Sequence, residues 1–523
     1  MLSKLFLMCC LCLAGAAQAT IAPALLAPLT GNDPDARVEA IARIGALAND
    51  DATRLLTALK NDALYATPDG HLLIVTDDKA YDPATGVTGP VPEGADGLMV
   101  NNRLRGAVDD ALSALKLFSP DRAQRLAAVT ELQKSVTLAQ APLIEKALAR
   151  ETDPEILPLL QLVAATANLQ SPDAAKRKLA VEALADSSNA NLRPVLQAML
   201  TEPDDGVRLA AAHTLQALDS RLARTEFIGN LFYGVSLGSV LLLTALGLAI
   251  TFGLMGIINM AHGELLMIGA YTTYLCQLAF RTYFPTAVDW YLIAALPAAF
   301  LATAAVGIAL ERTVIRWLYG RPLETLLATW GISLILMQSV RTIFGAQNVE
   351  VANPSWMSGG VTVLGSLVLA YNRIAIIVFA FIVVAGVWLI LKKTRLGLFV
   401  RAVMQNRRMA GCIGVSTAKI DMMTFGLGSG IAGLGGVALS QLGNVGPDLG
   451  QSYIVDSFMV VVLGGVGQLA GTIIAALGLG EANKFLEPVA GAVLAKIAIL
   501  IFIIIFIQKR TQGLFAMKGR SAE

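Results

Sequence analysis

The sequence predicts a mostly α-helical protein, with a helical-repeat half followed by a polytopic helical membrane half. Of its 523 residues, 55% are hydrophobic and only 15% are charged, which is typical of an integral membrane protein rather than of a soluble enzyme. The N-terminal half repeats short Pro-containing turns that each precede an Ala/Leu-rich helical pattern. From residue 231 onward, apolar segments of about twenty residues follow one another, and this length crosses a bilayer.

Residues 1–19 are predicted to be a cleaved signal peptide. Lys4 precedes an apolar run, and Ala17 and Ala19 have the spacing of small residues that a signal peptidase requires. Cys9, Cys10 and Cys12 would leave with this segment. The remaining Cys276 and Cys412 lie far apart in the membrane half, and we interpret them as small buried apolar side chains rather than as a disulfide or a metal site.

Residues 20–225 are predicted to form an extracytoplasmic helical domain. Turns containing SPD, TDP, EPD or NDP open helical patterns at 32–47, 119–132, 152–169, 171–184 and 202–218. Pro is expected near the first helical position, and Ser, Thr or Asp as the N-cap. The spacing of these units resembles HEAT-like α-solenoids, in which helix pairs stack. The β-prone runs at about 64–105 predict an insertion of one or two small hairpins.

This half of the sequence contains no nucleophile, metal or phosphate-binding motif. His71 and His213 have no neighbouring Cys or carboxylate at ligand spacing, so we expect ordinary surface or capping roles for them. A docking surface for another protein and a structural cap both stay open as functions of the domain.

Residues 226–523 are predicted to be a transmembrane domain with seven clear spans. These spans are placed at roughly 231–253, 257–280, 288–310, 324–345, 372–391, 421–441 and 489–508. The apolar run at about 454–479 is broken by GGVGQLAG, which predicts a re-entrant pair of short half-helices. Gly464, Gly465 and Gly467 are therefore candidate pathway or gate residues.

The distribution of Lys and Arg predicts the orientation. Basic residues gather at 312–321, 392–419 and 509–520, and these regions should be cytoplasmic because cytoplasmic loops carry an excess of positive charge. A cleaved signal peptide then places the helical domain in the periplasm. We expect a bacterial inner membrane protein with its C-terminus in the cytoplasm.

One polar break interrupts the apolar sequence. The segment FGLMGIINMAHGELLMIGAY at 252–271 contains Asn259, His262 and Glu264. Ionisable groups at membrane depth are costly, and they usually face a bundle interior or a water-filled path. Counting spans places this segment at the cytoplasmic end of the first two helices. Two interpretations stay open: helix capping at the membrane surface, and a direct gating or transport role for Asn259, His262, Gly263 and Glu264.

The loop at 391–421 is the second candidate region. Its segment RAVMQNRRMAGCIGV, residues 401–415, predicts a short amphipathic helix that is basic on one side. Binding to membrane lipid headgroups is one interpretation of such a helix.

Together these segments resemble one family. FGLMGIINMAHGELLMIGAY is similar to the most recognisable motif of permease subunits from ABC importers of the branched-chain amino acid and urea type. RAVMQNRRMAGCIGV resembles the cytoplasmic coupling loop of that family, and VVVLGGVGQLAGTIIAALGLG at 461–480 resembles its glycine-rich C-terminal segment. The resemblance covers residues 228–510.

The resemblance implies a permease that works with a second permease subunit, two ATPase subunits and a periplasmic substrate-binding protein. It implies no ATPase site in this chain, and the sequence contains no GxxxxGKS or GxxxxGKT phosphate loop. No cofactor, metal or nucleic acid is implied. Residues that would couple the permease to the ATPase are Arg401, Gln405, Asn406, Arg408, Ala410 and Gly414.

The N-terminal domain resembles that of urea-type permeases, which implies urea or a short-chain amide as the substrate. A branched-chain amino acid permease is the alternative. A third hypothesis, from another class, is a membrane-anchored scaffold or sensor that works through its helical-repeat domain.

Overall fold

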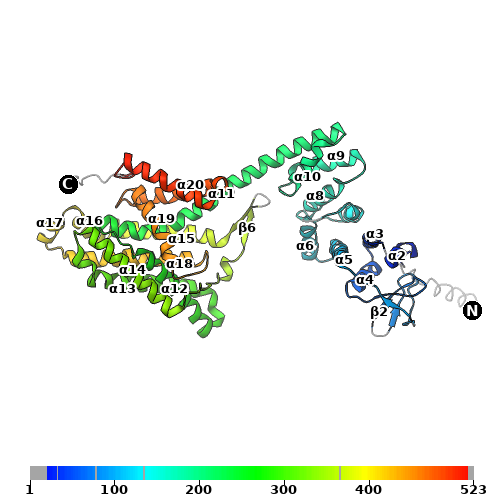
Figure 1. The fold of residues 1–523 in the computed structure, drawn as a ribbon, viewed down its shortest axis with the longest axis horizontal. Helices are drawn as coiled ribbons and strands as arrows, with labels where there is room; N and C mark the ends of the chain where they lie inside the picture. Colours follow the sequence, from blue (N-terminus) through cyan, green and yellow to red (C-terminus); the bar gives the residue numbers. More distant parts are fainter. Residues whose placement is uncertain are drawn as a thin grey trace, which may run out of the picture. The chain divides into compact units, whose positions relative to one another are not determined.

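The computed structural model describes residues 21–31, 33–76, 79–92, 94–133, 136–363 and 367–515, so the predicted signal peptide lies outside the described residues. The chain divides into two compact units, residues 1–222 and residues 223–523. Described residues are mainly helical, with small antiparallel sheets at 64–97 and 360–370 (Figure 1). The predicted mostly helical fold class is confirmed.

The first unit begins with three helices and a sheet packed on one apolar core. The helices are α2 (Pro23–Thr30), α3 (Pro34–Gly45) and α4 (Asp50–Lys60), and α5 (Asn102–Leu115) follows the sheet. Ile44, Leu55 and Val108 are fully buried in this core.

The insertion between α4 and α5 is a small sheet, in keeping with the β-prone runs expected there. Five short strands pair in the order β4-β3-β2-β1-β5, with antiparallel neighbours that place Leu64 opposite Ile74 and Ala80 opposite Gly89. Their bounds are β1 (Leu64–Ala66), β2 (Leu72–Thr76), β3 (Lys79–Tyr81), β4 (Thr88–Pro90) and β5 (Asp96–Gly97).

Helical repeats complete the first unit, as Figure 1 shows. The helices are α6 (Arg122–Leu132), α7 (Ala141–Leu148), α8 (Ile156–Asn168), α9 (Ala174–Ala183) and α10 (Leu192–Ala198), with 3-10 turns η1 (Lys116–Phe118), η2 (Leu138–Gln140), η3 (Leu184–Asp186) and η4 (Met199–Thr201). Of the prolines in the NDP and SPD turns, Pro34 is the first residue of its helix. Pro120 and Pro172 precede the caps, because Asp121 and Asp173 each accept a backbone N–H two residues later and the helix begins after them.

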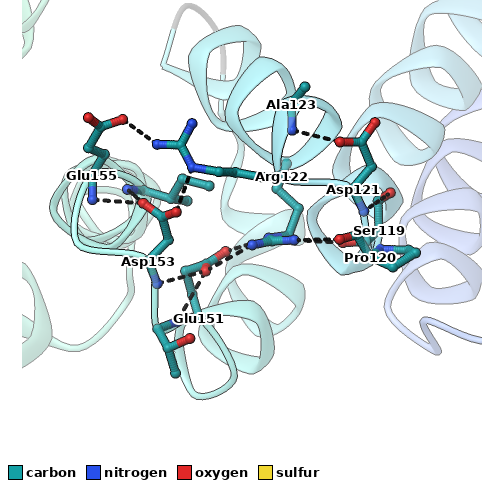
Figure 2. A network of polar contacts seen from close by, with 11 residues as sticks. Ser119, Pro120, Asp121, Arg122, Ala123, Glu151, Asp153 and Glu155 are labelled. Carbon is teal, nitrogen blue, oxygen red and sulfur yellow. Dashed lines mark hydrogen bonds and ion pairs between the residues drawn. The ribbon is translucent and has the colours of Figure 1, made fainter.

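Ion pairs join neighbouring repeats, as Figure 2 shows for α6 and the turn before α8. The Arg125 guanidinium donates to the carbonyl oxygens of Ser119 and Pro120 at 3.1 and 3.2 Å and to Glu151 at 2.9 Å. Arg122 donates to Asp153 at 2.7 Å. The hydrogen bond from Arg122, with others from backbone N–H groups, holds the pKa of the Asp153 carboxyl below its usual value.

The second unit consists of long helices. They are the later part of α11 (Asp205–Met255), then α12 (His262–Tyr283), α13 (Tyr291–Thr313), α14 (Pro322–Phe344), α15 (Tyr371–Lys393), α16 (Arg395–Gln405), α17 (Arg407–Cys412), α18 (Thr417–Ser440), α19 (Leu449–Gly464) and α20 (Leu469–Lys509). Short elements connect them: η5 (Pro285–Trp290), η6 (Ile315–Leu318), η7 (Ser355–Met357), β6 (Gly360–Val363) and β7 (Leu367–Ala370). The β6–β7 hairpin was not predicted.

Six helices in the described residues are long and apolar enough to cross a membrane, where seven spans were predicted. The difference is α12, whose polar side chains, such as His262, Glu264 and Gln277, make it less apolar than the others. The apolar windows of α11 and α18 are 83% and 78% buried, whereas those of α14, α15 and α20 are 22%, 17% and 17% buried. The first two therefore form the interior of this unit.

The predicted glycine interruption differs in its second half. α19 ends at Gly464, and Gly465 and Gly467 have φ of +98° and +84° before α20 begins. The second helix does not end near residue 479. It continues to Lys509 with a kink at Gly491, because no helix-breaking residue precedes Pro488. Cys412 is exposed rather than buried as expected, and Cys276 is half-buried.

Candidate functional site

The polar segment before α12 lies inside the second unit, in the turn between α11 and α12. α11 ends at Met255, Gly256 turns the chain with φ of +67°, and α12 begins at His262. The His262 Nε2 lies 2.8 Å from the carbonyl oxygen of Thr244. Thr244 precedes the end of α11 by about 16 Å at 1.5 Å per residue. The segment therefore folds back along α11 as far as Thr244.

Hydrogen bonds to α14 also place the start of α12 beside the middle of a long helix. The Thr329 hydroxyl accepts the Met260 N–H at 3.1 Å, and the Ser333 hydroxyl donates to Glu264 at 2.9 Å. Both hydroxyls belong to the middle of α14 (Pro322–Phe344). The start of α12 is thus surrounded by the central parts of α11 and α14.

The polar side chains of this segment are completely buried and only partly hydrogen-bonded. Asn259 and His262 have no exposed surface, and Glu264 is 1% exposed. Asn259 Oδ1 accepts the Ala261 N–H at 3.0 Å, so it stabilises the turn before α12 rather than capping the helix itself. Among the residues the structure describes, Asn259 Nδ2, His262 Nδ1, Glu264 Oε2 and the Tyr271 hydroxyl have no hydrogen-bond partner. Unpaired buried polar atoms are costly, and polar side chains within membrane segments usually face the bundle interior or a water-filled cavity.

α12 and α19 meet at their first turns. A Cβ added at Gly263 would lie 2.6 Å from the Gly450 carbonyl oxygen, and one at Gly450 would collide with the Gly263 carbonyl. Gly247 of α11 and Gly428 of α18 make a second mutual approach beside His262. Helix N-termini carry partial positive charge. At this junction two such helix ends lie near two carboxyl groups, those of Glu264 in α12 and of Asp448, the residue before α19.

A cavity of about 310 Å³ opens beside the start of α19. Its lining includes backbone-rich and polar residues of the 441–448 connection, namely Gly443, Asn444, Gly446 and Asp448, together with Asn348, Ser452 and Tyr453. The arrangement offers hydrogen-bond donors and acceptors to a small polar molecule.

The other predicted gate residues lie apart from this cluster. Gly464 packs against Gly471, where an added Cβ would lie 2.5 Å from the Gly471 carbonyl carbon. Gly465 lies against the carbonyl of Phe515, and Gly467 lies against Gly253 of α11. These glycines bring the α19–α20 turn close to α11 and to the C-terminal segment.

The predicted coupling helix at 401–415 is broken into two. α16 ends at Gln405 and α17 begins at Arg407, because the Asn406 side chain accepts the Met409 N–H at 2.9 Å and caps a new helix. Gln405, Asn406 and Arg408 are exposed. Arg401 donates to the Leu391 carbonyl, which ties α16 to the end of α15.

Small residues in this loop pack closely or supply a turn. Ala410 is 2% exposed and packs with Val400, Val403 and Ile420. Gly414 has φ of +90° and open space around it, so it supplies a turn rather than a close contact. Close packing occurs instead at Gly397, where an added Cβ would collide with the Leu391 backbone.

Sequence reasoning missed an ionic contact that anchors this loop. Arg407 forms a two-pronged ion pair with Asp421 of α18, and its guanidinium lies 4.6 Å from the Tyr319 ring centroid. The Asp421 side chain is 3% exposed. An acidic residue at the start of an apolar span was the available signal.

Among the described residues, no group of three or more His, Cys, Asp or Glu side chains is placed to hold a metal ion.

The second unit matches the family model described as branched-chain amino acid transport system / permease component, over residues 230–508. A model of HEAT repeats matches residues 159–227. A high-affinity branched-chain amino acid transport system permease protein of Pseudomonas aeruginosa is 30% identical over 272 residues, covering 51% of this chain and 88% of that protein. The Escherichia coli protein of the same description is 30% identical over 265 residues, covering 49% and 85%. No solved structure matches the chain.

Proposed function

The chain belongs to the branched-chain amino acid transport permease family, and from this premise we propose that it is the permease subunit of an ATP-driven ABC importer in a bacterial inner membrane. The supporting observation is the fully buried polar cluster of Asn259, His262 and Glu264 beside the middle of α11 and α14. A protein that only anchors a scaffold has no need for unpaired polar groups at this depth.

ATP hydrolysis is assigned to partner subunits. The proposed assembly contains a second permease subunit, two ATPase subunits and a periplasmic substrate-binding protein. The helical-repeat unit faces the periplasm, and α16 and α17 face the ATPase, with Gln405, Asn406 and Arg408 exposed for contact. Replacement of both Arg401 and Arg408 by Glu should uncouple ATP hydrolysis from transport; ATP-driven uptake at the normal rate would refute this assignment.

Transport proceeds by alternating access. ATP-driven closure of the partner subunits moves α16 and α17, and the Arg407–Asp421 ion pair carries that movement to α18. α18 contacts both α12 and α11 through close glycine approaches at Gly269–Gly433 and Gly247–Gly428. Movement of α18 would therefore shift the packing around His262 and Glu264.

Urea or a short-chain amide, the substrate expected from the resemblance of the N-terminal domain, is one candidate. A neutral amide needs donors and acceptors rather than a counter-charge, and the cluster offers both through Asn259, His262, Glu264 and Ser333.

A branched-chain amino acid is the other candidate, and the comparisons favour it. The relatives quoted above carry that substrate in their names. An ammonium group could bind at Glu264 and a carboxylate at the α12 and α19 N-termini.

Uptake into vesicles that contain the chain with its partners tests both candidates. Labelled urea should accumulate only when ATP, the binding protein and this chain are all present. Accumulation of leucine without urea would establish the second candidate. Accumulation of neither, with a fully assembled complex, would contradict both.

A further inference from the structure

The segment between α14 and β6, residues 345–359, is tied to several other elements, and we call it the strap. The Gln277 side-chain amide of α12 and the Tyr291 hydroxyl of α13 each donate to the carbonyl oxygen of Ala352 at 2.9 Å. The N–H and the hydroxyl of Ser355 donate to a carboxylate in η5 at 2.8 and 2.7 Å. The second half of the strap is therefore anchored to two helices and to the turn between them.

The first half of the strap is hydrogen-bonded through a single backbone pair. Val349 and Val445, which lies in the connection between α18 and α19, exchange both backbone hydrogen bonds at 2.9 Å. Among the described residues, these are the hydrogen bonds that residues 346–350 form. Gly345 precedes them with φ of +90°, a backbone conformation that favours glycine. Loss of the pair would leave residues 346–350 without hydrogen bonds to the rest of the unit.

This half of the strap forms one wall of the 310 Å³ cavity, where Asn348 faces the α18–α19 connection. A Cβ added at Gly446 would collide with Asn348 Oδ1 and would lie 2.9 Å from Asp448 Oδ1, so the glycine lets two polar side chains come together. Within the described part of the chain, neither side chain has a hydrogen-bond or ion-pair partner. Asp448 is the one charged residue among the described residues of the lining. The cavity therefore suits a solute that presents N–H donors.

The cavity adjoins the buried polar cluster. Tyr453, which lines the cavity, packs against an apolar cluster that contains Leu266, from the second turn of α12. The Asp448 carboxyl interacts electrostatically with Glu264 and with the Tyr271 hydroxyl. Glu264 Oε2 and that hydroxyl are buried and have no hydrogen-bond partner among the described residues. A solute in the cavity would thus lie next to unpaired polar groups inside the helical unit.

The length of α18 places the cavity on the other side of the membrane from α16 and α17. α18 has 24 residues, which extend about 36 Å at 1.5 Å per residue. This exceeds the thickness of the hydrocarbon core, about 30 Å. The loop that contains α16 and α17 precedes α18, and the connection that lines the cavity follows it. With α16 and α17 facing the ATPase, the cavity faces the periplasm.

We propose that this cavity is the first binding site of the solute on its path to Glu264, and that residues 346–350 close over it through the Val349–Val445 backbone pair. The inference rests on the proposed permease function. The solute is a small molecule with N–H donors, and the Asp448 carboxylate and the Asn348 amide oxygen accept its hydrogen bonds. Separation of the pair admits the solute from the periplasm, and its formation closes the cavity on that side.

A reversible covalent lock tests the closing role. Residues that exchange both backbone hydrogen bonds in an antiparallel pair have Cα atoms about 5.5 Å apart, which a disulfide can bridge. Val349→Cys with Val445→Cys, made with Cys276 and Cys412 replaced by Ser, should therefore form a disulfide on oxidation. ATP-driven uptake into vesicles should fall at least about tenfold in the oxidised protein and should return on reduction.

The matched control is a disulfide across another antiparallel pair. Val361→Cys with Leu369→Cys joins partners of the β6–β7 hairpin, whose described residues lie outside the cavity lining, and its oxidation should leave uptake unchanged. Full uptake by the oxidised 349–445 variant, with its disulfide verified by mass spectrometry, would overturn the closing role. Loss of uptake in the parent, which carries neither pair of cysteines, would instead overturn the permease function on which the inference rests.

Two glycines of the α18–α19 connection test the binding role without locking the strap. Gly446→Ala pushes Asn348 and Asp448 apart, and the ends of these side chains can move, so the fold is retained. The KM for uptake should rise about fivefold with an unchanged amount of assembled complex, as expected for the loss of one hydrogen bond. Gly443→Ala also lies in the cavity lining, but its Cβ meets nothing within 4 Å and the KM should not change. Equal KM values for the two variants would overturn the binding role.

Replacement of Asp448 tests the class of solute. Its side chain makes no capping hydrogen bond to α19, so its loss does not remove a helix cap. Asp448→Leu should raise the KM at least about tenfold, whereas Asp448→Asn, which keeps one oxygen acceptor, should raise it less. An unchanged KM in Asp448→Leu would overturn the assignment of a solute that is bound through its N–H donors.

Discussion

Replacing Gly263 by Ala tests the close approach between α12 and α19. The added Cβ would lie 2.6 Å from the carbonyl oxygen and 2.8 Å from the carbonyl carbon of Gly450, where ordinary contact begins at 3.4 Å. The two helices must therefore separate by roughly 0.8 Å, in an interior packed too tightly to absorb the change freely. Overpacking of this kind costs about 1–3 kcal/mol. We expect a lower melting temperature, by about 2–4 °C per kcal/mol, and slower uptake.

The assay compares this variant with Gly478→Ala. Gly478 lies within α20, and a Cβ there would meet nothing within 4 Å. Alanine should leave stability unchanged or raise it by up to about 1 kcal/mol, because alanine is the better helix former. Thermal unfolding of the detergent-solubilised chain and uptake into vesicles are measured for both variants. If Gly263→Ala melted and transported like Gly478→Ala, the proposed packing of the two helix starts would be wrong.

Three further predictions follow from charged groups. Glu264→Gln keeps the shape of the side chain and removes its charge. Uptake of a neutral amide should therefore fall less than about fivefold, while binding of an ammonium group should fall by more than tenfold. Uptake measured with urea and leucine in competition distinguishes these cases. Arg407→Ala leaves Asp421 buried without its partner, so it should lower the free energy of unfolding by about 1–3 kcal/mol and increase the ATP hydrolysed per solute. Lys419→Ala, at an exposed residue of the same loop, should change neither quantity. Adding Asp421→Asn to Arg407→Ala should restore part of the stability. Acid should destabilise residues 20–222: the pKa of Asp153 is lowered by folding, so its stabilisation is present above about pH 4 and is lost as the pH falls through the folded value. Melting curves by circular dichroism check this, and the pH dependence should be weaker in Asp153→Asn.

Local sequence signals predicted the elements of the fold well. Asp33, Asp121 and Asp173 cap helices where the turn motifs indicated them, because capping depends on residues within one turn. The membrane helices followed from apolar length alone. The glycine interruption at 464–467 was also visible, since positive φ at Gly465 and Gly467 is a local requirement.

Local sequence signals could not predict how far the polar segment folds back along α11, or which residues far apart in the sequence pair with one another. Counting spans does not show that the turn at Gly256 brings His262 beside Thr244, and only tertiary contacts reveal this. The partnership of Arg407 with Asp421 and the cap at Asn406 likewise depend on how α16 and α17 pack. Amphipathic periodicity predicted one continuous helix there because it does not register a competing side-chain cap.

The most direct test of the central claim is the ATP-driven uptake of labelled urea and leucine by vesicles in which Glu264 is replaced by Ala. The account places this carboxyl at the buried start of α12, hydrogen-bonded to Ser333 and otherwise unpaired. It predicts that uptake of the transported solute falls at least tenfold while the complex of permease and ATPase subunits still assembles. Undiminished uptake of both solutes by Glu264→Ala would contradict the claim that the polar cluster serves transport.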